Sequence, residues 1–360
     1  MITKFYMPIL KTKQGEFLAL SLLNPNIQGY VVPLIDVANK EFNNEEGIDP
    51  ETIEEHLDTV TNRICKKWPR TNAFLDAHLV SDTSPDGINP VTYIYNNLSA
   101  AKIYPSPVLR LSTTKSCKEA IREVMSKHNL PEPAIRIFIN DIMSEDFAGN
   151  LQALLNYFSL NPSGVHMVLD LAAADFSNTE DFSDSILDQL RDFPEFKSWK
   201  SFTICGGSFP KTQLLQSGEN IVPRGEWIFY GKLVTKLKVQ EFSRHINYGD
   251  YGIIAPGHFK FDFRKMDRSA NIRYTHDEDW FVVKGNSIKL NGSEQYIGLA
   301  KDIVKSDYFM GERFSDGDNH LKKTTQRGGK AGNTLVWNRV GFNHHFAKVM
   351  RDLSASYLAS

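Results

Sequence analysis

Four aspartates stand at the ends of short apolar segments, in the strings PLID, FLD, FIND and MVLD. They are Asp36, Asp76, Asp141 and Asp170. If the segments are neighbouring parallel strands, their carboxyl ends meet at one edge and the carboxylates converge. Converging carboxylates repel one another unless a cation, a proton or an arginine compensates them. Asp36, Asp76 and Asp170 could bind Mg²⁺ or another divalent cation, or one of them could act as a general acid or base.

Basic and small polar residues occupy comparable positions after other apolar segments. Arg110 and Lys11 would offset the acidic charge and stabilise a negatively charged substrate. The other candidate contacts at such positions are Asn140, Gly207, Ser208 and Asp250. Gly207 and Ser208 follow the seventh apolar segment, and barrels often bind phosphate with the loops after their seventh and eighth strands. A structural role stays open for each residue, because an aspartate after a strand often caps the next helix.

The last hundred residues hold further candidates. Arg327 and Lys330 lie in a Gly-rich basic segment that could reach the same ligand, although such a segment is usually just a loop. Asn343 is placed to cap a helix that begins at His344. A helix N-terminus disfavours the imidazolium form, so a neutral ring there could act as a base. Adjacent helical side chains diverge by about 100°, so we expect only one of His344 and His345 to serve the site.

Eight apolar segments must position these residues. Each is four to seven residues long, rich in Val, Ile, Leu and Phe, and apolar on both faces, which is typical of buried parallel strands. The segments are 5–10, 31–37, 73–76, 107–111, 135–141, 165–171, 202–206 and 251–255.

Helical spacing of apolar residues characterises most of the intervening chain. The predicted helices are 14–23, 50–67, 114–128, 143–158, 183–193 and 233–244. Alternation of helices with eight strands predicts an α/β fold, a TIM-like (β/α)₈ barrel. A doubly wound open sheet is the competing fold, but the GxGxxG loop that often follows its first strand does not occur in the sequence.

The C-terminal part of the chain does not continue the alternation of buried strands and helices. It predicts a β-hairpin at 271–285, a helix at 294–306, a polar loop at 316–333, a strand at 335–340 and a last helix at 344–359. We therefore expect residues 1–255 with 342–360 to form the barrel. Residues 256–341 would be an insertion between the eighth strand and the last helix, a lid over the mouth where barrel active sites lie.

Composition excludes several classes of protein. The 360 residues include 41 Lys and Arg against 43 Asp and Glu, and this balance argues against a duplex nucleic-acid coat. The three cysteines form no CxxC pair, so a zinc knuckle is excluded and reduced thiols are expected. No stretch approaches the ~20 apolar residues of a membrane helix. We expect a cytoplasmic protein without membrane partners.

The strings MPILKTKQGEFLAL, PLIDV, RYTHDEDWFVVKG and WNRVGFNHHFAKVMR together resemble the Beta protein family. This family is encoded by phages and by bacterial mobile or defence regions, and the resemblance spans essentially the whole chain. It implies an α/β barrel. It also implies that the recurring residues of the family correspond here to Lys11 or Lys13, Asp36, Trp337, His344 and His345. The resemblance supplies no established activity and supports only the location of a site.

The leading hypothesis is a hydrolase that acts on a phosphate-bearing small molecule or nucleotide. Asp36, Asp76 and Asp170 would hold the cation or supply the acid and base, and His344 would assist proton transfer. The alternative is a catalytically silent module that recognises a phage component or protein partner in phage–host conflict, because no complete catalytic motif is present. Single-stranded nucleic-acid binding through residues 322–330 and nearby aromatics is a third hypothesis.

Overall fold

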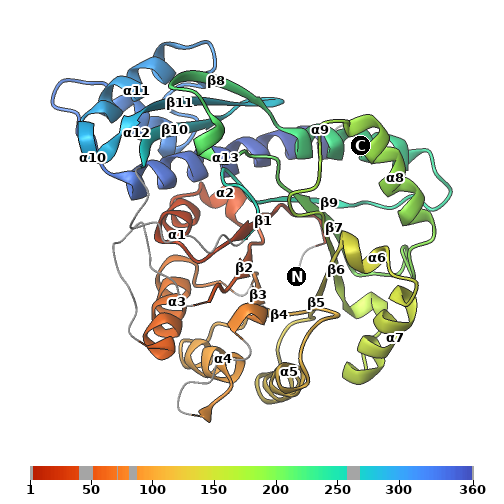
Figure 1. Ribbon diagram of the computed structural model, residues 1–360. Helices are drawn as coiled ribbons and strands as arrows, with labels where there is room; N and C mark the ends of the chain where they lie inside the picture. The colour runs from red at the N-terminus through yellow and green to blue at the C-terminus, as the bar shows by residue number, and fades with distance from the viewer. Residues whose placement is uncertain (1–2, 40–51, 71, 81–86, 258–267, 359–360) are drawn as a thin grey trace.

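Eight parallel strands close into a barrel in the order β1-β2-β3-β4-β5-β6-β7-β9, with β9 paired to β1 (Figure 1). The strands are β1 (Met7–Leu10), β2 (Leu34–Asp36), β3 (Phe74–Asp76), β4 (Ser106–Leu109), β5 (Ala134–Phe138), β6 (His166–Asp170), β7 (Ser201–Gly206) and β9 (Asn247–Asp250). The structure is a computed structural model that describes residues 3–39, 52–70, 72–80, 87–257 and 268–358. The predicted (β/α)₈ barrel is confirmed.

Helices connect the strands and surround them (Figure 1). They are α1 (Gln14–Ser21), α2 (Pro25–Gln28), α3 (Ile53–Lys67), α4 (Pro90–Ala100), α5 (Lys115–His128), α6 (Ile139–Ile142), α7 (Phe147–Phe158), α8 (Thr179–Arg191), α9 (Gly225–Lys238) and α13 (Thr334–Leu358). Local capping explains several starts: the Thr114 hydroxyl accepts from the Cys117 N–H at the head of α5. The start of the predicted helix 50–67 lies partly outside the described residues.

The eighth strand lies earlier in the chain than predicted. It is β9, Asn247–Asp250, and not the apolar segment 251–255. The reason is a buried polar residue: the Asn247 amide accepts from the Phe5 N–H at 3.1 Å and donates to the Thr3 carbonyl at 3.0 Å. Because the hydrogen bonds of its buried Asn247 are made within the protein, β9 is a buried strand without the apolar composition that we expected of one.

A second, three-stranded antiparallel sheet has the order β10-β11-β8. Its elements are β8 (Gly218–Pro223), β10 (Ser269–Thr275) and β11 (Asp279–Ser287), accompanied by α10 (Ile288–Asn291), α11 (Gln295–Lys305) and α12 (Asp316–Thr324). The predicted hairpin and the helix at 294–306 are confirmed by β10–β11 and α11. Strand β8 comes from the chain between β7 and α9. That residues 256–341 form a separate unit stays a prediction.

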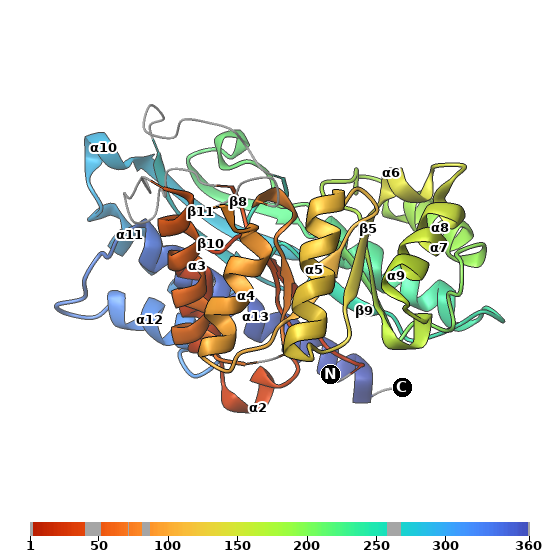
Figure 2. The same ribbon diagram turned by 90° about the horizontal axis from the view of Figure 1, so that it is seen from below.

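This sheet and its helices flank the barrel. Both β10 and α12 pack against α13. Figure 1 shows the sheet beside the ring of strands, next to α13, and not across the ring. Figure 2 shows α2 at one end of the barrel and α6, which directly follows β5, at the other end, the mouth.

Two predictions near the C-terminus are wrong. The expected loop at 316–333 begins with helix α12, whose first turn is capped by the Ser315 hydroxyl on the Asp318 N–H. The expected strand at 335–340 is the start of α13, which runs from Thr334. Asn343 therefore lies within this helix, where its side chain donates to the Ala19 carbonyl and accepts from the Gly317 N–H.

An apolar layer fills the barrel below the mouth. It includes Met7, Ile9, Phe74 and Val168. Residues that alternate with these along the strands pack instead against the surrounding helices, as the two faces of a strand require.

We expect Gly249→Ala to destabilise the fold, because a Cβ at this position would overlap the Cys205 Sγ and lie 2.9 Å from the Met7 carbonyl oxygen. Overpacking of this kind costs about 1–3 kcal/mol of unfolding free energy. Gly231→Ala in α9 is the control, since its Cβ would meet no atom within 4 Å. That substitution should leave stability unchanged or raise it by up to about 1 kcal/mol. Urea unfolding measures both, and equal stabilities of the two variants would contradict the packing argument.

Candidate active site at the barrel mouth

Arg136, in the middle of β5, lies at the centre of the acidic strand ends. Its Nε and Nη2 donate to Asp170 Oδ2 at 2.9 and 2.6 Å. Its Nη1 donates to Asp76 Oδ2 at 2.8 Å and to Asp36 Oδ2 at 3.3 Å. The three aspartates are the last residues of β6, β3 and β2. The structure therefore brings three of the four predicted carboxylates together around one guanidinium, whereas Asp141 Oδ2 accepts from the Phe138 N–H at 2.7 Å.

Arg110, directly after β4, adds a second guanidinium. Its Nε and Nη2 donate to Asp76 Oδ2 at 2.9 and 2.5 Å, and Nη2 lies 3.6 Å from Asp36 Oδ1. The Phe138 ring packs against both guanidinium groups, with its centroid 5.3 Å from Arg110 Cζ and 5.2 Å from Arg136 Cζ. We call Asp36, Asp76, Asp170, Arg110 and Arg136 the carboxylate–guanidinium cluster.

Tyr251 completes the hydrogen bonding of the cluster. Its hydroxyl donates to Asp170 Oδ2 at 2.7 Å and accepts from Arg136 Nη2 at 3.2 Å. Burial, and then the charge of Asp170, raise the pKa of Tyr251 well above its ordinary value. The phenol therefore stays protonated and acts as a donor.

The cluster is buried, and its two guanidiniums offset most of the charge of its three carboxylates. Asp76 and Asp170 have no exposed surface, Asp36 and Arg136 are 2% exposed, and Arg110 is 9% exposed. Burial opposes the charge of Arg136, but the neighbouring carboxylates outweigh it and hold the pKa of Arg136 above its usual range. Paired, hydrogen-bonded ions of this kind are stable inside a protein, whereas a single one is not.

The cluster does not fit the divalent cation that the sequence suggested. Asp36, Asp76 and Asp170 converge on the nitrogen atoms of Arg136, so a guanidinium occupies the side of the carboxylates that a cation would need. Over the described ranges of the chain, no three or more His, Cys, Asp or Glu side chains are arranged to hold a metal ion. These aspartates are held by arginine and do not form the expected Mg²⁺ site.

Lys11 lies at the mouth, and other predicted contacts lie away from the cluster. Lys11 Nζ donates to the Gly257 carbonyl in the loop after β9. Lys13 precedes α1, where its backbone N–H donates to Glu16 Oε2 at 3.0 Å. Asn140 is exposed on α6. Of the three residues, Lys11 contributes positive charge to the mouth.

Gly207 and Ser208 are committed to contacts within the protein. The Gly207 N–H donates to the Ala172 carbonyl at 2.9 Å. The Ser208 hydroxyl donates to Glu226 Oε2 at 2.6 Å, and its N–H contacts the same oxygen at 3.2 Å. Burial raises the pKa of Glu226 to about 7, against opposing effects of Arg224 and the Ser208 hydroxyl. The expected phosphate contact at Ser208 is thus replaced by a buried carboxyl.

Asp250 lies outside the cluster, on the opposite face of the barrel wall. Because Tyr251 points into the barrel, the preceding residue points toward the helices. Asp250 Oδ1 accepts from the Tyr6 hydroxyl at 2.6 Å, and Oδ2 contacts His345 Nε2 at 2.9 Å. Burial raises the pKa of Asp250, but His345, Tyr6 and the Gly252 N–H outweigh it and hold the pKa below its ordinary value.

His344 is also separate from the cluster, and it does not stand at a helix N-terminus. Its Nδ1 lies 2.8 Å from Asp318 Oδ2, and its Nε2 lies 2.7 Å from the Thr275 carbonyl. Both ring nitrogens are thus engaged by partners outside the cluster. The Tyr274 ring stacks on it with centroids 3.8 Å apart. The proton-transfer role expected of His344 is therefore not available at the carboxylates.

The remaining predicted contacts lie after α12 and at the start of α13. Arg327 and Lys330 are exposed between the two helices. Trp337 is buried, stacks on Tyr296 of α11 with centroids 5.2 Å apart, and donates through Nε1 to the Ala331 carbonyl at 2.7 Å. Trp337 therefore packs α13 against α11.

Sequence reasoning missed Arg136, Tyr251 and Glu226. A signal for Arg136 was present: it lies two residues after Ala134 in β5, at a position that alternation assigns to the barrel interior. A charged residue at such a position needs a partner. Tyr251 was assigned to the eighth strand, and nothing in its local sequence distinguished Glu226.

The closed ring of strands and the charged mouth define an α/β barrel protein with a polar site at the carboxyl ends of its strands. A sequence model of the Beta protein family matches residues 6–351. The chain therefore belongs to the Beta protein family. No curated protein matches the sequence significantly.

Two solved structures are distantly similar to this chain. Triosephosphate isomerase from Bartonella henselae is 12% identical, with a TM-score of 0.33 over 69% of this chain and 92% of that one. The 3-keto-D-glucoside 4-epimerase from E. coli is 9% identical, with a TM-score of 0.32 over 72% of this chain and 95% of that one. Within the described residues, the helices are too short or too polar to cross a bilayer.

Arg136→Met should destabilise the protein by about 3–5 kcal/mol, because it leaves three buried carboxylates with one guanidinium. Arg122→Met, at an exposed position of α5, is the control and should cost much less. Urea unfolding measures both. An equal loss of stability in the two variants would contradict the electrostatic argument.

Glu226→Gln should change how stability depends on pH. A carboxyl whose pKa in the folded protein is about 7 stabilises the fold fully in acid and loses that contribution as the pH rises through this value. Glutamine does not titrate, so the variant keeps its stability as the pH rises from about 5 to about 8 while the wild type loses up to about 3 kcal/mol of unfolding free energy. The difference in stability between variant and wild type should therefore shift in favour of the variant over this range. Exposed Glu219→Gln on β8 is the control and should track the wild type. Parallel curves for all three proteins would disprove the assignment.

Proposed function

We propose that the barrel mouth binds a phosphate-bearing small molecule or nucleotide, and that Arg110 is the principal contact. The observation that carries the proposal is the order of exposure in the carboxylate–guanidinium cluster. The carboxylates are at most 2% exposed, whereas Arg110 is 9% exposed. A ligand that enters from the mouth thus meets a cation first.

Arg110 is oriented for such a contact. Two of its nitrogens, Nε and Nη2, are fixed on Asp76. No hydrogen bond from Nη1 to another described residue is present, so this edge of the guanidinium can donate to a ligand. A guanidinium held in place by a carboxylate loses little entropy on binding, and its planar fork matches the oxygens of a phosphate.

The charge balance supports an anion. Three carboxylates in the cluster carry a formal charge of −3, and Arg110, Arg136 and Lys11 carry +3, so the group sums to zero. Arg110 is more exposed than any of the three carboxylates, whereas Arg136 is as buried as Asp36. The field at the mouth therefore favours a negatively charged ligand although the group as a whole is neutral.

Binding without catalysis is the stronger form of this proposal. A phosphoester hydrolase needs a general base or a metal-bound water, and each aspartate of the cluster accepts from a guanidinium. Hydrolysis, the leading hypothesis from sequence, is therefore the second candidate. The proposal takes up the alternative of a silent recognition module in a phage or defence context, with a small anion as ligand in place of a protein partner.

Arg110→Ala should weaken binding of a phosphate ligand by about 10–100-fold, the value of one charge-assisted contact. Isothermal titration with inorganic phosphate and with a panel of nucleoside mono- and diphosphates measures the effect. The phosphate affinity of Arg110→Lys should lie between those of Arg110→Ala and the wild type, because lysine keeps the charge but lacks the planar guanidinium. Arg122→Ala on α5 is the matched control.

Two results would reject the proposal: no member of the panel binds the wild type, or Arg110→Ala binds as tightly as Arg122→Ala does. Phosphate release during the same titrations distinguishes hydrolysis from binding alone. Steady release that is lost in Asp170→Asn but not in Arg122→Ala would favour the second candidate.

A further inference from the structure

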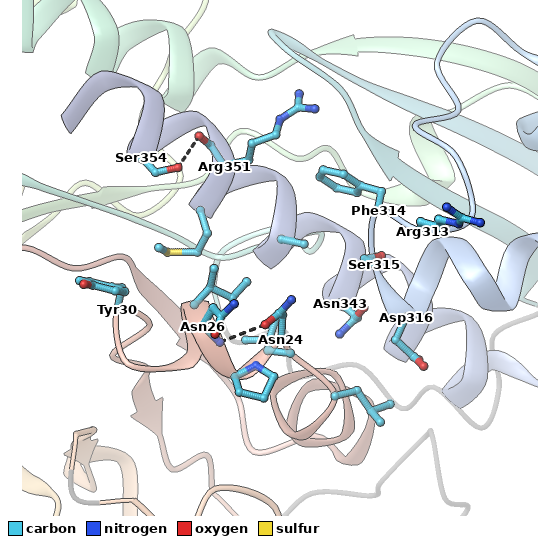
Figure 3. A pocket seen from close by; sticks show the side chains of 16 residues that line it. Asn24, Asn26, Tyr30, Arg313, Phe314, Ser315, Asp316, Asn343, Arg351 and Ser354 are labelled. Atoms are coloured by element: carbon cyan, nitrogen blue, oxygen red, sulfur yellow. Dashed lines mark hydrogen bonds between the residues drawn. The ribbon is translucent and has the colours of Figure 1, made fainter. Parts of the chain in front are cut away.

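A cavity of about 850 Å³ lies between the α1–α2 connection, α13 and the segment just before α12 (Figure 3). Helix α2 is at the end of the barrel opposite the mouth (Figure 2), so this cavity is distant from the carboxylate–guanidinium cluster. Its volume is in the range of small-molecule sites, which often form where two structural units meet.

The floor of the cavity is apolar. It is lined by Leu23 of the α1–α2 connection, Ile27 of α2 and Met350 of α13. Large apolar side chains at its edge are uncovered: Leu22 is 40% exposed and Tyr30 is 55% exposed. Burying this surface beneath the tail of a ligand would be favourable at roughly 25 cal/mol per Å².

Two arginines stand on the opposite side of the opening from Tyr30. Figure 3 shows Arg313 and Arg351 on either side of Phe314, with their side chains pointing apart. The Arg351 guanidinium lies 5.2 Å from the Phe314 ring centroid, and its Nε is 3.6 Å from Asp352 Oδ1. Arg313 is exposed and makes no ion pair with any described residue.

Asp316 also lines the cavity, but its carboxylate does not neutralise Arg313 or Arg351. Its Oδ2 accepts from Arg339 Nη1 at 2.9 Å instead. The cavity therefore combines an apolar floor with a cationic rim whose charge is not compensated from within it.

We infer that this cavity is a second ligand site, which takes a carboxylate with an aliphatic tail. The tail would lie on Leu23, Ile27 and Met350. The carboxylate would lie at the rim and accept a hydrogen bond from one of the two arginines, Arg313 or Arg351; this contact is weaker for a neutral head group and repulsive for a cationic one.

The test uses the full chain and decanoate, with decyltrimethylammonium as a probe of similar length and opposite charge. We expect decanoate to bind one site per chain and the cationic probe to bind at least about tenfold more weakly. Arg313→Ala with Arg351→Ala should raise the dissociation constant of decanoate at least about tenfold. Arg191→Ala, on the exposed face of α8, and Arg110→Ala at the mouth should leave it unchanged. Arg110→Ala should weaken phosphate binding at the mouth but not decanoate binding in the cavity. A failure of this inference can therefore be told apart from a failure of the proposed function.

Ala347→Trp should abolish decanoate binding, because the indole would fill the cavity from α13. Ser354→Trp, at an exposed lining position, serves the same purpose if the first variant does not fold, as judged by circular dichroism. Binding that survives in a folded tryptophan variant would overturn the inference. So would equal affinity for the two probes, or a stable dimer in light scattering that decanoate does not perturb.

Discussion

The guanidinium of Arg136 is the interaction on which the mouth of this barrel depends. Closure of eight parallel strands brings the ends of β2, β3 and β6 to the same rim, and each of these strands ends in an aspartate. Three buried carboxylates repel one another strongly, so the barrel can close with them ionised only when cations lie among them. Arg136 supplies hydrogen bonds to all three, at 2.6 to 3.3 Å. One consequence is that the side chains at the base of the mouth are held in place by several hydrogen bonds. Another is that aspartates, which are common metal ligands, here bind arginine instead.

The two-residue repeat of the strands creates a second polar network on the other face of the wall. Asp250 and Tyr251 are neighbours, yet the first contacts Tyr6 and His345 outside the barrel and the second contacts the cluster inside it. Thr275 of β10 extends this outer network: its hydroxyl lies 2.8 Å from His345 Nδ1, and its carbonyl lies 2.7 Å from His344 Nε2. Two histidines that diverge around α13 are thus linked through a single residue of the flanking sheet. Burial lowers the pKa of His345, which keeps that ring neutral and able to accept from the Thr275 hydroxyl while it donates to Asp250.

The sequence was sufficient to predict the barrel and its acidic rim, because both follow from short-range patterns: apolar segments of strand length, and an aspartate at the end of several of them. It was insufficient wherever the decisive contact is remote along the chain. Asn247 is acceptable within a buried strand because residues 3 and 5 satisfy its amide. The segment 335–340 has the composition of a strand and is helical because α13 packs along α1 and β10. The position of His344 in the same helix follows from that packing, and with it the loss of the role that a helix N-terminus would have given it.

Arginine has different roles in this molecule, and the number of carboxylates around each one explains the difference. Arg136 contacts three carboxylates and is 2% exposed, so its hydrogen-bonding capacity is used within the fold. Arg110 is fixed mainly by Asp76, through Nε and Nη2, and is 9% exposed. Arg351 approaches a carboxylate only through Nε, at 3.6 Å, and its side chain is 49% exposed. As the number of carboxylate partners falls, the free energy that a new anion can gain from the guanidinium rises, because fewer of its donors are already satisfied. The count of acidic neighbours ranks these three arginines, but it is not a general rule in this chain, because buried Arg224 is held by the backbone carbonyls of His276 and Asp277 instead of by several carboxylates.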